Sequence, residues 1–97
     1  MSDIFFSKDP YNINELFLAY KRNSDDEEAK NRFFRSLDRL SFDVAMHLYP
    51  SKHDRSNNQT DIYVLMRDYS KSYKGTEFYD CVKTHIRESY SRPAFFN

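Results

Sequence analysis

An unbroken apolar stripe between Ser24 and Pro50 constrains the fold of this chain more than any other feature. Its members recur at intervals of three or four residues, which is the period of one face of an α-helix. They are Ala29, Phe33, Leu37, Leu40, Val44 and Leu48, with Phe34, Phe42 and Ala45 widening the stripe. We expect one long helix over residues 24–49, either continuous or broken near Ser41. Pro50 ends it, because the residue before a proline avoids helical backbone angles.

Two capping boxes predict where the first two helices begin. In such a box a polar side chain accepts a hydrogen bond from an amide of the first helical turn, and a glutamate three residues later reaches back. Asn12 and Glu15 fit this pattern at the start of a helix over residues 12–22. Ser24 and Glu27 fit it at the start of the long helix.

Two more helices follow a polar segment, residues 51–59, which we expect to be the one long loop. Residues 60–74 and 76–90 each carry apolar side chains at helical spacing. Residues 61–66 also alternate as a strand does, but the helical spacing continues beyond them. We expect Asn58 or Thr60 to cap the start of the third helix, Gly75 to be its left-handed C-cap, and Thr76 to cap the start of the fourth.

These segments predict a single all-α domain over residues 1–97, a compact bundle of four helices with tails at 1–11 and 92–97. The single glycine excludes phosphate-binding loops, which need several. Fifteen basic and fifteen acidic side chains balance, which argues against a strongly basic nucleic-acid-binding protein and against an acidic DNA mimic.

No apolar run approaches the length of a membrane span, and the N-terminus lacks the features of a secretory signal. A single cysteine permits no internal disulfide and is typical of a reducing compartment. We therefore expect a soluble cytoplasmic protein that does not bind membranes.

Cys81 and His85 lie one helical turn apart and could face a cation. Buried cysteine and histidine on an apolar face are more often ordinary core residues, however, and His47 and His53 follow no known ligand spacing. No third group is placed to orient Cys81 as a nucleophile. We expect no metal, no cofactor, no small-molecule substrate and no enzymatic activity.

Basic side chains on the polar faces have two interpretations. They could contact phosphates, while the tyrosines between them stack on bases. They could instead compensate the helix dipoles, because acids lead and bases trail in all four expected helices. The nucleic-acid hypothesis concerns Arg32, Arg35 and Arg39 of the long helix, and Tyr79, Lys83, Arg87 and Tyr90 of the fourth.

The order of the motifs resembles domain 2 of the sigma-70 family of RNA polymerase initiation factors, of the extracytoplasmic-function type. The residues that carry the resemblance are Glu28-Ala29 before Phe33-Phe34, the ladder Leu37, Phe42, Ala45 and Leu48, Asp61-Ile62, and the run Gly75, Thr76, Phe78, Cys81, Val82 and Ile86. It implies RNA polymerase binding through residues 61–73 and contact of the fourth helix with promoter DNA. The partner-binding residues are then Asp61, Tyr63, Arg67, Asp68 and Tyr69.

An inhibitor or immunity-type protein from a phage or mobile element is the alternative. Such a protein would block a host protein through an aromatic surface, because aromatic side chains are enriched in interface hot spots. The candidates exceed what a small core must bury, although packing in a chain without tryptophan is the competing explanation. They are Tyr49, Tyr63, Tyr79, Phe95 and Phe96.

Overall fold

A computed structural model describes residues 8–49 and 52–90 of the chain, without the side chains of residues 52–57 and 90. Within these ranges it has four helices and no strand: α1 (Ile13–Arg22), α2 (Glu27–Leu48), α3 (Lys52–Ser72) and α4 (Phe78–Tyr90). The expected all-α architecture of four helices is therefore confirmed. The predicted tail 92–97 and the Phe95 and Phe96 of the aromatic hypothesis lie outside the described residues.

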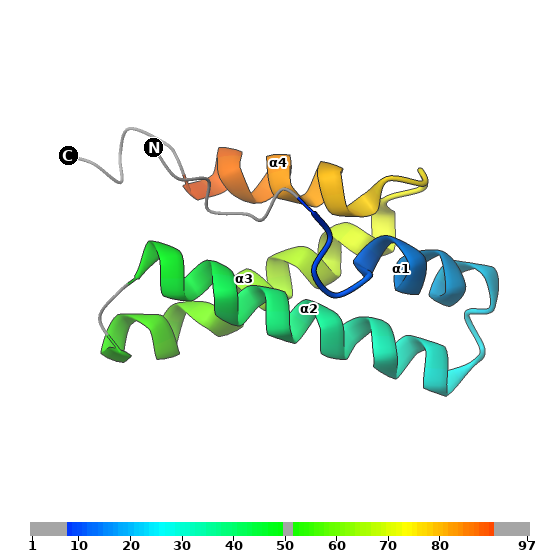
Figure 1. Cartoon of the computed structure of the whole chain (residues 1–97), viewed down its shortest axis with the longest axis horizontal. Helices are drawn as coiled ribbons and strands as arrows, with labels where there is room; N and C mark the ends of the chain where they lie inside the picture. The colour runs from blue at the N-terminus through cyan, green and yellow to red at the C-terminus, as the bar shows by residue number, and fades with distance from the viewer. Residues whose placement is uncertain (1–7, 50–51, 91–97) are drawn as a thin grey trace.

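The two long helices, α2 and α3, form an antiparallel pair on which the two short helices pack (Figure 1). α1 lies against α2 and α4, and α4 also packs on α3. No helix in the described ranges is both long and apolar enough to cross a membrane.

Three phenylalanines from three helices form the centre of the core. The ring of Phe17 stacks on that of Phe78 at 4.7 Å between centroids, and Phe33 meets both rings edge-on at 5.6 and 5.5 Å. All three are essentially inaccessible to solvent. Burial of each ring contributes about 1.5–3 kcal/mol, so this cluster stabilises the contacts among α1, α2 and α4.

The capping box predicted at Asn12 is wrong. Asn12 has a left-handed backbone with φ of 54°, and its side chain makes no capping hydrogen bond. Asp9 replaces it, because its carboxylate accepts a hydrogen bond from the amide of Asn14 at 2.8 Å. Asn14 in turn accepts one from the amide of Tyr79 at 2.7 Å, so a side chain of α1 caps the start of α4. The cap of α4 comes from a residue 65 positions away, so it leaves no local sequence signature.

The capping box predicted at Ser24 is also wrong, because α2 begins three residues later. Asp26 is its N-cap, and its carboxylate accepts hydrogen bonds from the amides of Glu28 and Ala29. The helix continues through Ser41, whose hydroxyl donates to the carbonyl of Asp38 at 2.6 Å, so the continuous form of the long helix is the right one.

The loop predicted at residues 51–59 is wrong, because α3 already begins at Lys52. Neither Asn58 nor Thr60 is therefore a cap. Extending an existing helix costs far less than nucleating one, so a polar segment can join a helix that packing stabilises further along. Gln59 also reaches α2, donating weakly to Asp38 at 3.4 Å.

Gly75 does not have the predicted left-handed conformation. A glycine is needed there because there is no room for a side chain: an added Cβ would lie 2.4 Å from the hydroxyl oxygen of Tyr73. That oxygen accepts a hydrogen bond from the amide of Glu77 at 3.1 Å, in the turn before α4. α4 begins at Phe78, two residues beyond the predicted start at Thr76.

Candidate functional site

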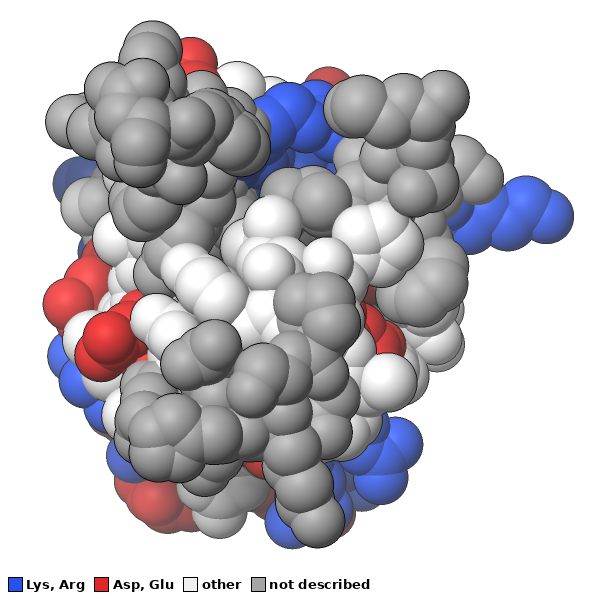
Figure 2. Space-filling view, turned by 90° about the vertical axis from the view of Figure 1, so that its left-hand side faces the viewer, with Lys and Arg blue, Asp and Glu red and all other residues white. Residues whose placement is uncertain are grey.

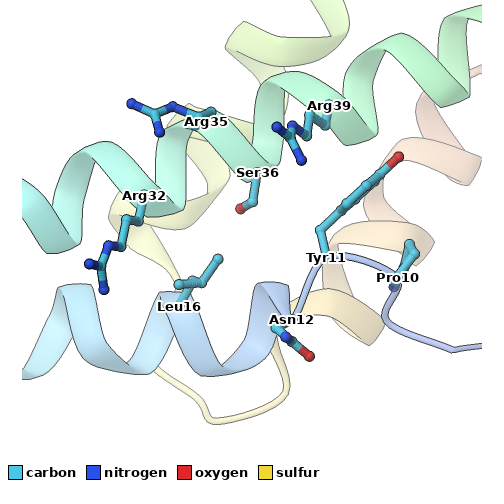
Figure 3. A pocket seen from close by; sticks show the side chains of 8 residues that line it. All are labelled: Pro10, Tyr11, Asn12, Leu16, Arg32, Arg35, Ser36 and Arg39. Carbon is cyan, nitrogen blue, oxygen red and sulfur yellow. The ribbon is translucent and has the colours of Figure 1, made fainter.

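A groove of about 380 Å³ runs between α1 and α2, and basic side chains line one wall. We call it the arginine groove (Figure 3). It is lined by Pro10, Tyr11, Asn12, Leu16, Arg32, Arg35, Ser36 and Arg39. No carboxylate lines it. The three arginines predicted on the long helix therefore lie together at one hollow.

The helix period explains why these arginines share a side of α2. Positions 32, 35 and 39 are separated by three and four residues, so they fall within one helix face. Figure 3 shows them following one another along α2, with Arg32 reaching toward α1. Leu16 of α1 and Ser36 of α2 face each other below them.

Ion pairing distinguishes Arg32 from Arg35 and Arg39. Arg32 donates to Glu28 at 2.8 Å, one turn earlier on α2. Arg35 and Arg39 form no ion pair within residues 8–49 and 52–90. Asp43 lies one turn from Arg39, but its carboxylate accepts a hydrogen bond from the hydroxyl of Tyr11. Arg35 and Arg39 therefore keep guanidinium groups that can bind an anion.

Tyr11 closes one end of the groove and ties the segment before α1 to α2. Its hydrogen bond to Asp43, together with burial, raises the pKa of the tyrosine hydroxyl above its usual value. Sequence reasoning placed Tyr11 in a tail. It could not foresee this contact, which joins residues 32 positions apart.

Two exposed apolar side chains continue the arginine row along α2. Phe42 is 43% exposed and Met46 is 46% exposed, and no other large apolar side chain in the described part of the chain is so open. Their positions extend the spacing of 32, 35 and 39 by three and four residues, so all five lie on one side of the helix. The sequence spacing contains this signal, but the prediction assigned Phe42 to the apolar stripe and to the ladder of the sigma-factor resemblance.

The predicted α4 residues do not join the groove. Tyr79 is only 2% exposed and donates to the carbonyl of Lys8, so its ring belongs to the core and offers no surface for a base. Lys83 lies over that ring at 4.8 Å and 3.6 Å from Asp80. Arg87 is exposed on α4, and the side chain of Tyr90 lies outside the described residues.

The predicted partner-binding residues of α3 divide into two groups. Asp61 and Asp68 are exposed, and the guanidinium of Arg67 lies 5.7 Å from the ring centre of Tyr63. Tyr69 faces α4, where its ring stacks on His85 at 4.6 Å, and burial raises its pKa. Tyr63 is likewise half-buried against the core, so the two tyrosines pack within the fold and the two aspartates are exposed.

Cys81 and His85 contact aromatic side chains. The thiol of Cys81 donates to the hydroxyl of Tyr73 at 3.4 Å, which raises the pKa of that tyrosine, and His85 stacks on Tyr69. No three metal-binding side chains of the His, Cys, Asp or Glu type cluster within the described ranges, which leave out the side chain of His53. Both side chains therefore serve the packing of α3 on α4.

The surface at the end of the molecule where α2 meets α3 differs from the arginine groove. In Figure 2 uncharged side chains occupy the centre of this end, and the described Lys and Arg side chains lie toward its rim.

Comparison with known proteins gives no relative. No protein family, no curated protein and no solved structure matches this chain.

Proposed function

We propose that this protein is a non-enzymatic domain that binds single-stranded nucleic acid along α2. Arg35 and Arg39 contact phosphates in the arginine groove, and Phe42 stacks on a base. The observation that carries this proposal is a row of two arginines without ion pairs, continued on the same side of the helix by an exposed aromatic ring. Phosphate contacts plus aromatic stacking is the usual chemistry of single-strand binding.

The helix dipole does not account for these arginines. Its influence is confined to the last turn, whereas Arg39 lies more than two turns before α2 ends at Leu48. From Arg32 to Met46 the row extends about 21 Å along the axis, at about 1.5 Å per residue. An elongated row of this length suits a chain of nucleotides better than a single small anion.

Binding of a fluorescently labelled single-stranded oligonucleotide, followed by anisotropy at low salt, tests the proposal. The single strand should bind more tightly than a duplex of the same length, because only unpaired bases can stack on Phe42. Absence of binding at low salt would remove nucleic acid as the ligand. A duplex that bound equally well would remove the stacking role of Phe42.

A protein partner on α3 is the second candidate function. Asp61 and Asp68 are seven residues apart, so these exposed carboxylates share one side of α3. Asp61 has no ion pair within the described part of the chain. The resemblance to sigma-factor domain 2 makes RNA polymerase the first partner to test, and the alternative is a host protein that this chain inhibits.

Affinity purification from cell extract separates these two partners. RNA polymerase subunits should be recovered with the wild-type protein and lost with Asp61→Ala/Asp68→Ala. Recovery of a different protein, lost with the same variant, would favour the inhibitor hypothesis. Recovery that the variant does not change would exclude this side of α3.

A further inference from the structure

A second cationic hollow lies at the opposite end of the bundle from the surface in Figure 2. It forms where α1 and α3 both end and the chain turns into α4, and its volume is about 600 Å³. We call it the cationic pocket. Four basic side chains surround it: Lys21, Arg22, Lys71 and Lys74. Phe17, Leu18 and Tyr73 supply apolar wall, and no carboxylate lines it.

These four cations are not compensated within the described structure. None of them forms an ion pair there. The ammonium of Lys21 donates to the carbonyl of Lys71 at 3.4 Å and lies 5.6 Å from the ring centres of Phe17 and Tyr20, but it meets no carboxylate there. Burial and the positive charge of Lys74 both lower the pKa of Lys21. The cations therefore repel one another, and an anion in the pocket would relieve that repulsion.

Helix dipoles offset only part of this charge. Each helix C-terminus carries about half a negative charge, so the ends of α1 and α3 together balance about one of the four positive charges. About three remain. A single carboxylate would leave most of this charge uncompensated.

We propose that the cationic pocket binds a nucleoside triphosphate, with the phosphates among the four cations and the base against Tyr73. A triphosphate carries about four negative charges near neutral pH, because the last ionisation of a phosphate has a pKa near 6. Its charge is thus large enough to neutralise the roughly three positive charges that remain in the pocket, and its base can pack on the apolar wall. The volume falls in the range of about 300–1,000 Å³ that is typical of small-ligand sites. This site shares no lining residue with the arginine groove.

Titration calorimetry with ATP tests the proposal, with inorganic triphosphate and adenosine as separate ligands. ATP should bind at one site, inorganic triphosphate more weakly, and adenosine more weakly still. Lys71→Ala/Lys74→Ala should weaken ATP binding about a hundredfold, at about tenfold for each lost charged hydrogen bond. Neither side chain makes a hydrogen bond or ion pair within the described residues, and the variant removes repulsion with Lys21, so its melting temperature should equal or exceed that of the wild type.

Lys8→Ala is the matched control, because it removes an exposed charge outside the pocket and should leave ATP binding unchanged. Wild-type protein that does not bind ATP would overturn the proposal. So would unchanged ATP affinity in a folded Lys71→Ala/Lys74→Ala variant. Inorganic triphosphate that binds as tightly as ATP would overturn the contact between the base and Tyr73. Because oligonucleotide binding is measured separately, its failure would leave this result intact.

Discussion

The arginine groove and the cationic pocket are both hollows lined by cations, but they differ in how the cations are placed. In the groove the charges come from one helix and form a row that leads to Phe42. In the pocket they come from the ends of two helices and the following turn, and they surround an apolar wall. The placement of the cations therefore suits different ligands: the row fits an extended polymer, and the ring fits a compact polyanion.

Charge reversal in the groove should give the largest effect. Arg35→Glu/Arg39→Glu should weaken binding of the single-stranded oligonucleotide by about a hundredfold or more, since two charged contacts of about 1.5 kcal/mol are lost. Lys30→Gln is the control, because Lys30 lies on the same helix but outside the groove and pairs with Glu27 at 3.0 Å. Equal affinity of wild type and the double variant would show that the polymer binds elsewhere.

Oligonucleotide binding in the arginine groove should also depend on the salt concentration. If Arg35 and Arg39 contact phosphates, the logarithm of the affinity should fall with the logarithm of salt with a slope of about −1.4. Between about 50 and about 200 mM salt, the oligonucleotide affinity should then drop about sevenfold. Removing Arg35 alone, as Arg35→Ala, should make the slope shallower by about 0.7. A slope near zero in the wild type would contradict phosphate contacts.

The row of arginines could be predicted from the sequence, but the hollow that it lines could not. The positions of Arg32, Arg35 and Arg39 follow from the helix period alone, which left open whether α2 is continuous or broken near Ser41. The other wall depends on how closely α1 approaches and on the contact of Tyr11 with Asp43. Such contacts join distant positions, and periodicity carries no information about them.

The ends of the helices were predicted less well for a related reason. Asn14 caps α4 from 65 positions away, and Asp9 caps α1 in place of the predicted box at Asn12. The cationic pocket lies at two helix ends, Arg22 and Ser72, joined only by tertiary packing. Its cations were visible in the sequence as trailing charges, but their convergence was not.

Gly75→Ala should disturb the pocket and leave the groove intact. The new Cβ would lie 2.4 Å from the hydroxyl oxygen of Tyr73, so the ring must shift and the hydrogen bond to the amide of Glu77 must weaken. We expect a loss of about 1–3 kcal/mol in the free energy of unfolding, as is usual for overpacking. Chemical denaturation measures it.

Lys74→Ala, one residue earlier in the same turn, provides the comparison and should be at least as stable as the wild type, because it removes repulsion with Lys21. In Gly75→Ala the oligonucleotide affinity should also stay at the wild-type value, because Gly75 does not line the groove. Equal stability of Gly75→Ala and wild type would mean that the turn adjusts without moving Tyr73.

Tyr11→Phe should give the smallest change in stability, and it should affect the arginine groove but not the cationic pocket. Loss of the hydrogen bond to Asp43 at this half-buried site should cost about 1 kcal/mol of stability. It should also change the response to alkaline pH. The folded state raises the pKa of Tyr11 above its usual value of 10.0, so the folded state holds this proton more tightly than the unfolded chain. Stability from Tyr11 is therefore complete below pH 10 and is lost as pH rises through the raised pKa.

The difference in stability between wild type and Tyr11→Phe should accordingly shrink as the pH rises above 10. Tyr69 and Tyr73 also have raised pKa values, but both are present in the variant, so their contribution cancels in this difference. Urea denaturation of both proteins at neutral and at alkaline pH measures the effect. A stability difference that does not change with pH would show that the hydrogen bond to Asp43 does not control the ionisation of Tyr11, and that its ring alone holds that end of the groove.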